Sequence, residues 1–497
     1  MNQIKVDGAT PLIGAVWNDS DDGDCADIVT ALLENGSDVH QTNHFGNTPV
    51  CFASGSGKVA TLKVLVEYGG DVRLANPNGT TPISIAAQEG HTAVLEFLLE
   101  KGVDVNGARD NGATHISIAS AWGHAEALKL LIEKGGEVNK ARSNGATPMY
   151  VASMWGHVEI LKILIEHGGD VHAATSDGST PVAIASLEGH AGALRILIES
   201  GGDVNKATNA GHTPAFFAAR EGAWETLQIL LDNGGDVNQL DAEGWTPVHV
   251  ASANGQIDTL QILIKWIIHQ ANISGRSPNT ASITAGHLNT VDFSGTSPLH
   301  MAADEGETEV LKILLNHGAD IHKPDASNRT PVWIAAQEGH TDSLHTLLKA
   351  GANARTANAF GDFTLHIASK QGQIDVVRVL AESWPTNPLG WRMFLMGGGA
   401  ASELQDYLAP PANRATRNYL PRLYSKPDMM KEIWKFMYKP QYVDPGQLNH
   451  FGRTAARIAA DNEHGEIVEL LQGLGVDEGV DFGALAHVAA VDHGDDY

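Results

Sequence analysis

The sequence predicts an all-α repeat solenoid, a fold in which short helices from successive repeats stack into one continuous core. The first observation is a 33-residue period, marked by the dipeptide Thr-Pro and kept unbroken from position 48 to position 246. The second is that each period contains two short apolar segments separated by a glycine-containing break. Helices this short cannot bury their apolar faces alone, so the repeats must stack. The anchors, with Thr114-His115 filling the slot between 81 and 147, are Thr48, Thr81, Thr114, Thr147, Thr180, Thr213 and Thr246.

One repeat, residues 78–106, shows why its residues favour a pair of helices. Thr81 can cap a helix with its hydroxyl, and Pro82 suits the first helical position, where its missing N–H costs nothing. Gly90-His91 breaks the first apolar segment, and a second segment follows with Val and Leu at helical spacing. Gly102 then ends the second segment at a position that favours a left-handed backbone. The spacing predicts one helix after Pro82, a second after His91, and a hairpin-like turn before the next Thr.

This pattern resembles the ankyrin repeat, whose signature is G-x-T-P-L-H-x-A-A, then G-H, then L-L-x-x-G-A-D-V-N. The segments GWTPVHVASANGQ (244–256) and GTSPLHMAADEGE (295–307) match it closely. The resemblance covers roughly residues 10–380 and 448–478, and it implies about twelve stacked helix-turn-helix units with β-hairpin-like loops. Local departures are His115 and Ala455 in place of Pro, and a frequent Gly-Gly-Asp in place of Gly-Ala-Asp. Anchors outside the unbroken run are Thr10-Pro11, Ser297-Pro298, Thr330-Pro331, Thr364-Leu365 and Thr454-Ala455.

We expect four regions along the chain. An ankyrin-like array of about eleven units comes first, and a final capping repeat comes near the C-terminus. Between them lies a mostly helical insertion rich in aromatic residues and proline, and an acidic tail follows. The boundaries are 1–383 for the array, with a loop insertion near 265–290, 384–447 for the helical insertion, 448–478 for the capping repeat and 479–497 for the tail.

Two smaller interruptions lie inside the array. In the first unit the turn between the helices is stretched into WNDSDDGDCAD (17–27), whose acidic spacing suggests a calcium loop. The closing bidentate Glu of such a loop would have to stand at Val29, so we expect a solvated acidic turn instead. The second interruption, residues 265–290, is rich in Ser, Thr and Asn after an extended second helix. This composition predicts a flexible surface loop, with a phosphorylated or partner-binding loop as the alternative.

The insertion at 384–447 differs from the repeats in composition. It holds ten of the thirty aromatic residues and has a local charge of +3. Within it, PDMMKEIWKFMY (427–438) begins with a helix-start signal and has an apolar face. The final repeat either reaches the eleventh unit past a looped-out insertion or is separated from it by helices of the insertion. The aromatic residues either cover the end of the array or form a second interface, for which the candidates are Trp391, Phe394, Trp434 and Phe436.

The net charge of −26 narrows the classes of partner. It argues against sequence-independent nucleic-acid binding and against adsorption to anionic membranes, both of which need clustered Lys and Arg. It is compatible with basic protein partners. The two cysteines fit a reducing compartment, and we find no signal peptide and no apolar run long enough to span a membrane. We therefore expect an intracellular protein of the cytoplasm, with the nucleus as the alternative.

No pattern for catalysis or cofactor binding stands out. The segment GGGAAS (397–402) lacks the Gly-Lys-Ser/Thr ending of a phosphate loop. Most of the 23 histidines recur once per repeat, so they should form ladders along the stack rather than metal clusters. We find no H-E-x-x-H, no zinc-spaced Cys pair and no Ser-His-Asp arrangement. We expect no catalytic residues, no metal and no cofactor, and a non-enzymatic scaffold or adaptor, with an enzyme or ligand pocket in the 384–447 insertion as a less favoured alternative.

The resemblance implies that a protein partner binds on the concave face, through loop tips and the first helix of each pair. Trp122, Met154, Trp155 and Leu187 occupy equivalent positions after the Ala-Ala pair of three successive units, where the repeat does not require large apolar groups. The alternative is that these rings pack between units as core. Flanking Glu and Asp residues predict a basic or mixed basic-apolar partner. The full set of candidate contact residues is Trp122, Tyr150, Met154, Trp155, Leu187, Phe216, Arg220, Trp245 and Arg329, and the flanking acids are Glu89, Glu188, Glu221, Asp304, Glu305 and Glu338.

The resemblance also concerns one asparagine slot after the second helix. Asparaginyl hydroxylases act on this slot in proteins of the family, and a structural Asn that holds the turn is the alternative. The residues in it are Asn106, Asn139, Asn205 and Asn238.

Overall fold

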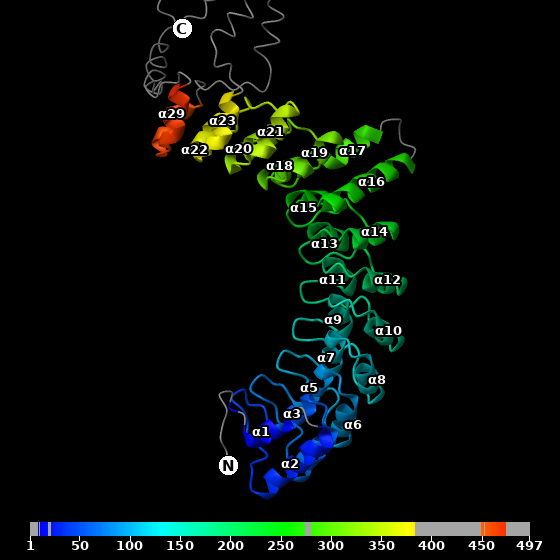
Figure 1. The fold of residues 1–497 in the computed structure, drawn as a ribbon. Coiled ribbons are helices and arrows are strands. Elements are labelled where there is room, and N and C mark those ends of the chain that lie inside the picture. The colour runs from blue at the N-terminus through cyan, green and yellow to red at the C-terminus, as the bar shows by residue number, and fades with distance from the viewer. Residues whose placement is uncertain are drawn as a thin grey trace, which may run out of the picture. The chain divides into compact units, whose positions relative to one another are not determined.

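The computed structural model describes residues 8, 10–17, 21–273, 280–382, 449–451 and 453–473. Within these residues the regular structure is helical, apart from one isolated antiparallel bridge between Ala108 and Thr114. Twelve helix pairs follow one another along the described chain (Figure 1). They divide into two compact units, Met1–Ala242 and Glu243–Tyr497. The all-α repeat array predicted from the sequence is confirmed.

The first unit contains seven helix pairs, in which the odd-numbered helix precedes the even-numbered one. Their bounds are α1 (Pro11–Val16), α2 (Asp22–Glu34), α3 (Pro49–Gly55), α4 (Val59–Glu67), α5 (Pro82–Glu89), α6 (Thr92–Glu100), α7 (His115–Trp122), α8 (Ala125–Glu133), α9 (Pro148–Met154), α10 (Val158–Glu166), α11 (Pro181–Leu187), α12 (Ala191–Glu199), α13 (Pro214–Glu221) and α14 (Trp224–Asp232).

In its described residues, the second unit contains five pairs and one additional helix. The pairs are α15 with α16, α18 with α19, α20 with α21, α22 with α23 and α28 with α29. The bounds are α15 (Pro247–Ala253), α16 (Ile257–Ile273), α17 (Thr280–Leu288), α18 (Pro298–Asp304), α19 (Thr308–Asn316), α20 (Pro331–Glu338), α21 (Thr341–Lys349), α22 (Thr364–Lys370), α23 (Ile374–Glu382), α28 (Ala455–Asp461) and α29 (Gly465–Gly473).

Local chemistry sets the helix bounds where the sequence predicts them. The Thr81 hydroxyl accepts a hydrogen bond from the Ser84 N–H at 3.3 Å, and Pro82 is the first residue of α5. Gly90 ends α5 with φ +76°, and Gly102 follows α6 with φ +74°. Because Thr-Pro and Gly recur with the period, the same start and stop recur in most pairs.

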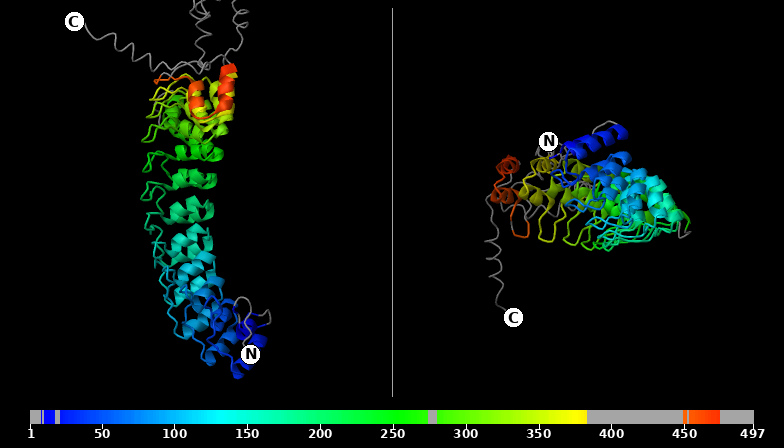
Figure 2. Two further views of the ribbon diagram at one scale, coloured as in Figure 1. Left: turned by 90° about the vertical axis from the view of Figure 1, so that its left-hand side faces the viewer. Right: turned by 90° about the horizontal axis from the view of Figure 1, so that it is seen from below.

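The helices of each unit form two layers. First helices pack on first helices, as α5 does on α3 and α7, and second helices pack on second helices, as α6 does on α8. Leu, Ile, Val and Ala side chains between the layers are almost fully buried. Within each unit the loops that join one pair to the next project from the same edge of the layers (Figures 1 and 2). The site considered below lies on the layer of first helices.

Histidines at the Gly-His turns link each repeat to the one before it. His124 Nε2 donates to the carbonyl oxygen of Gln88 at 2.8 Å, and the imidazole lies against Gly90, where an added Cβ would come 2.5 Å from His124 Nδ1. Glycine at this turn therefore supplies both the positive φ and the space for the next repeat. The same bond to the preceding repeat is made by His91, His124, His157, His190 and His340, and also by His464, which follows Glu463 rather than Gly.

The acidic stretch of the first repeat (17–27) is not simply a solvated turn over its residues 21–27. Residues 22–34 are helical, so the stretch ends in α2 rather than in a loop. The Asp22 carboxylate accepts hydrogen bonds from the N–H groups of Ala60 (2.6 Å) and Thr61 (2.9 Å) and from the Thr61 hydroxyl (2.8 Å). Asp22 therefore caps the start of α4 from the neighbouring helix pair, because the N-cap residue Lys58 makes no side-chain cap bond of its own.

The prediction of a flexible loop across 265–290 is wrong for much of its length. Residues up to Ile273 continue α16, and residues 280–288 form α17, which packs against α16. Leu288 and Thr284 are buried. Leu288 thus belongs to the core, although the Ser- and Thr-rich composition of the segment predicts an exposed loop.

The final repeat stacks directly on the eleventh. Helix α28 packs against α22 and α29 against α23, and His464 Nε2 donates to the Lys370 carbonyl at 3.0 Å. Of the two arrangements left open by the sequence, the described residues show the continuous stack. The insertion itself and the acidic tail lie outside the described residues, as do Trp391, Phe394, Trp434 and Phe436.

The structure also corrects one anchor of the repeat. The N-cap of α22 is Phe363, and Thr364 takes the first helical position, where other pairs carry Pro. The step from the Thr330 cap is therefore 33 residues, as elsewhere, and 91 residues separate Phe363 from the Thr454 cap. The loop sets this register, because Asn358 accepts hydrogen bonds from the N–H groups of Phe360 and Asp362. The Thr364-Leu365 dipeptide therefore lies one position after the place where the Thr-Pro dipeptide lies in other repeats.

Candidate protein-binding surface

Four side chains at the ends of three successive first helices form the candidate surface, which we call the Trp surface. Trp122 is the last residue of α7, Met154 is the last residue of α9, Trp155 is the C-cap of α9, and Leu187 is the last residue of α11. Trp122 and Trp155 are 58% and 59% exposed, whereas Met154 and Leu187 are half-buried. Exposed tryptophans repeated along one layer are unusual for a surface that meets only water.

A buried cluster lies under the Trp surface. Tyr150, only 8% exposed, packs with Ala146, Val151 and Ile184, and the half-buried Met154 and Leu187 pack on this cluster. Burial raises the pKa of the Tyr150 hydroxyl, which is hydrogen-bonded to the Ser179 side chain. Tyr150 therefore belongs to the core, as the alternative interpretation expects, whereas the two tryptophans lie outside the core.

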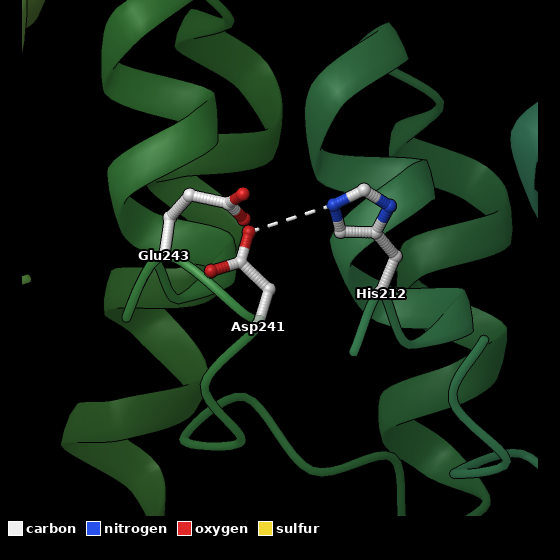
Figure 3. Close-up of side chains that lie close together, drawn as sticks. All are labelled: His212, Asp241 and Glu243. Carbon is white, nitrogen blue, oxygen red and sulfur yellow. Dashed lines mark ion pairs between the residues drawn. The ribbon is translucent and has the colours of Figure 1, made fainter. Parts of the chain in front are cut away.

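Phe216 is also core rather than surface. It is 4% exposed and stacks on the imidazole of His212, with ring centroids 4.5 Å apart. His212 Nε2 lies 3.5 Å from Asp241 Oδ2, as Figure 3 shows. The side chain of Phe216 is thus held inside the layer and has little area left for a partner.

The remaining predicted contact residues have local partners. Arg220 pairs with Glu221 at 2.7 Å and lies over the Phe217 ring. In the second unit, Trp245 Nε1 donates to Asp292 at 3.2 Å. Arg329 in the same unit pairs with Asp325 at 2.7 Å. Of the predicted contact residues, the structure therefore brings Met154 and Leu187 together with Tyr150, whereas Trp245 and Arg329 belong to the second unit.

Two arginines beside the Trp surface were missed by sequence reasoning. Arg109 donates to the Gln88 side-chain oxygen (3.0 Å) and to the Ser84 hydroxyl (3.5 Å). Arg142, one repeat later, donates to the Ser117 hydroxyl (2.8 Å). In the sequence, these two residues differ from the pattern because they are Arg at a loop position where other repeats carry Asn, Thr or Asp.

The acidic residues predicted to flank the surface are exposed. In the first unit they are Glu89, Glu188 and Glu221, at the ends of α5, α11 and α13. In the second unit the pKa of Asp304 is raised, first by partial burial and then by the nearby charges of Glu338 and Glu305. Acidic side chains at helix ends thus repeat along the first-helix layer of each unit.

Among the described residues, no helix has the length and apolar character that crossing a membrane would need.

Comparison with known proteins agrees with this architecture. A family model described as ankyrin repeats (3 copies) matches residues 12–108, 105–175, 167–241, 216–325 and 299–390, which together span well over half of the chain. The search of curated proteins finds no match.

Proposed function

The chain belongs to the ankyrin-repeat family, and from that premise we propose that it is a non-enzymatic scaffold or adaptor that binds a protein partner. Ankyrin repeats are generally protein–protein interaction modules and are typically non-catalytic. The observation that carries the proposal is the Trp surface, where Trp122 and Trp155 are exposed and the neighbouring Met154 and Leu187 pack on the buried cluster around Tyr150. The partner docks its apolar side chains there.

The energetics favour this surface over the rest of the layer. Tryptophan is the residue most enriched among interface hot spots, and truncating a hot-spot side chain costs about 2–4 kcal/mol of binding free energy. The buried cluster under the Trp surface is already ordered, since Tyr150 and its neighbours are packed in the unbound protein. Little side-chain entropy is then lost on binding, which leaves more of the burial energy for affinity.

The flanking charges support a partner with a basic or mixed basic-apolar surface. Glu89 and Glu188 are exposed on either side of the Trp surface along the stack. Charges at the rim of an interface act mainly on the association rate and on orientation. Binding should therefore weaken with added salt more through slower association than through faster dissociation.

The test compares W122A/W155A with W224A in the full chain. Partners are first identified by affinity purification and mass spectrometry, and the dissociation constant of each is then measured. Trp224, 53% exposed at the start of α14, is the matched control, because it lies in the second-helix layer. We expect W122A/W155A to weaken binding by about 100-fold or more, and W224A to leave it unchanged. Equal effects of the two variants would contradict the proposal.

A second candidate is a partner that binds residues 384–447, with the chain as a subunit of a larger assembly. The observation that favours it is the direct packing of α28 on α22, two helices that are separated in the sequence by residues 384–447. Deleting 387–444 leaves eight residues between α23 and Asn449, as many as join α21 to Asn358. Partners lost from this deletion but kept by W122A/W155A would establish the second candidate.

We place the protein inside the cell. Cys25 and Cys51 are both buried and form no disulfide within the described part of the chain, and burial raises the pKa of the Cys51 thiol. Cysteines that form no disulfide are typical of reducing compartments.

A further inference from the structure

In most inter-repeat loops one side chain closes the turn as a hydrogen-bond acceptor. Asn76 Oδ1, for example, accepts from the N–H groups of Asn78 and Thr80 at 3.0 Å each. The residue lies five positions before the N-cap of the next helix. The same slot closes the turn through Asn43, Asn76, Thr175, Thr208, Asp292, Asp325, Asn358 and Asn449.

Arg109 and Arg142 occupy this slot in two successive loops. A guanidinium has no acceptor atom, so neither can close its turn. Asn111 Oδ1 accepts from the Ala113 N–H at 3.0 Å in one loop, and Asn144 Oδ1 accepts from the Ala146 N–H at 3.1 Å in the other. The fold therefore does not need arginine at these two positions.

Both guanidinium groups lie half-buried against the preceding first helix and, among the described residues, donate hydrogen bonds only to neutral groups. The acceptors are the Gln88 amide and Ser84 hydroxyl for Arg109, and the Ser117 hydroxyl and carbonyl for Arg142. Within the described part of the chain neither makes an ion pair, although the protein carries 59 carboxylates. Burial lowers the pKa of both arginines, and the charge of Arg109 lowers that of Arg142 further. Two neighbouring cations thus lack the anion that such a site would favour.

The arginines border the Trp surface. Arg142 lies on Ser117 of α7, and Ala121 is one helical turn further along the same face. Ala121 packs against the cluster around Tyr150, and Trp122 is the next residue. A short peptide segment can therefore reach the two guanidinium groups and the Trp surface together.

We infer that Arg109 and Arg142 bind a carboxylate of the protein partner, on a segment whose apolar side chains contact the Trp surface. The inference rests on the proposed function and deepens it by naming the chemistry of the partner segment. Arg suits this task because its planar fork can bind a carboxylate through two parallel hydrogen bonds. The neutral contacts to Ser and Gln hold the forks in place without neutralising them. The partner segment thus combines a carboxylate for the arginines with the basic groups that face Glu89 and Glu188.

The test uses random 12-residue peptides displayed on phage and selected on the full chain. Parallel selections use R109Q/R142Q, W122A/W155A and the control R73Q/R195Q. The control removes the same two charges elsewhere, because Arg73 caps carbonyls at the end of α6 and Arg195 pairs with Glu225. Thermal melting checks each variant, and R109K/R142K keeps the charge without the fork.

The wild-type chain and the control should enrich peptides with Asp or Glu at a fixed spacing from an apolar residue. R109Q/R142Q should lose the acidic position and keep the apolar one. For a synthetic peptide from the selection, replacing its Glu by Gln should weaken binding about tenfold to wild type, less to R109K/R142K, and under about twofold to R109Q/R142Q.

Two results separate failure of this inference from failure of the proposed function. An enriched apolar motif with no acidic position, or an acidic position retained on R109Q/R142Q, overturns the carboxylate site alone. Absence of any motif that depends on Trp122 and Trp155 overturns both.

Discussion

Four asparagines each bridge their repeat to the next one, and the contribution of these bridges can be tested in both directions. Asn139 Nδ2 donates to the Gly168 carbonyl at 2.9 Å, and Asn139 Oδ1 accepts from the Asp170 N–H at 2.8 Å. Asn106, Asn205 and Asn289 make the same two bonds. His172 occupies the equivalent slot, and no such bridge from its side chain is present among the described residues. N139A should therefore uncouple two repeats, and H172N should couple two others more tightly.

The magnitude follows from two exposed hydrogen bonds. A typical hydrogen bond contributes about 0.5–1.5 kcal/mol to stability, and exposure favours the lower part of that range. N139A should lower the local free energy of unfolding by about 1–2 kcal/mol, and H172N should raise it by about 1 kcal/mol. In a repeat array this energy is a coupling between neighbours, so the effect should stay near the altered repeat.

Hydrogen exchange measured by mass spectrometry reads this local effect. In N139A the Asp170 amide should exchange about 5–30 times faster, since 1.4 kcal/mol corresponds to tenfold. In H172N the Asp203 amide, two residues beyond Gly201, should exchange more slowly. The Asp236 amide, bonded to Asn205 Oδ1 at 2.7 Å, is the internal control and should not change. Unchanged exchange at Asp170 would refute the idea that the bridge couples the repeats.

Three further predictions follow from single contacts. D22A should speed hydrogen exchange in α4 about 30-fold, because the lost cap corresponds to about 2 kcal/mol. The control D24A removes an equal charge from the same turn and should change exchange in α4 little. Equal effects of the two variants would contradict the capping role. T364P should raise the melting temperature for two reasons. It removes a buried hydroxyl that has no hydrogen-bond partner among the described residues, and it places proline at the first helical position of α22. A lower melting temperature would count against Phe363 as the N-cap of α22. D304N should raise the melting temperature at pH 7, because the raised pKa of the Asp304 carboxyl means that its charged form destabilises the fold. This gain should vanish as the pH falls below 3.8, where the carboxyl is protonated in both the folded and the unfolded chain. A gain independent of pH would argue against an electrostatic cause.

Much of the fold is readable from the sequence because its signals are local. A Thr hydroxyl bonds the N–H three residues ahead, Pro fits the first helical position, and Gly permits the left-handed backbone that ends a helix. These contacts span only a few residues, so the period alone predicts where most helix pairs begin and that they must stack. The misplaced cap at Phe363 shows the limit, since there the closed loop at Asn358 overrides a Thr one position later.

The candidate site depends on residues far apart in the sequence. Trp122 and Tyr150 are both large aromatic residues on first helices, yet Trp122 is exposed at the last position of α7, whereas Tyr150 lies in the first turn of α9 and packs with Ile184 of the next repeat. The Asp22 cap, the asparagine bridges and the position of Arg142 on Ser117 likewise join residues 25 or more positions apart. The sequence by itself determined the repeat, its helices and the composition of the layer. Only the tertiary structure decided which side chains are exposed and which are buried, because a side chain of one repeat is covered by the repeats that stack against it.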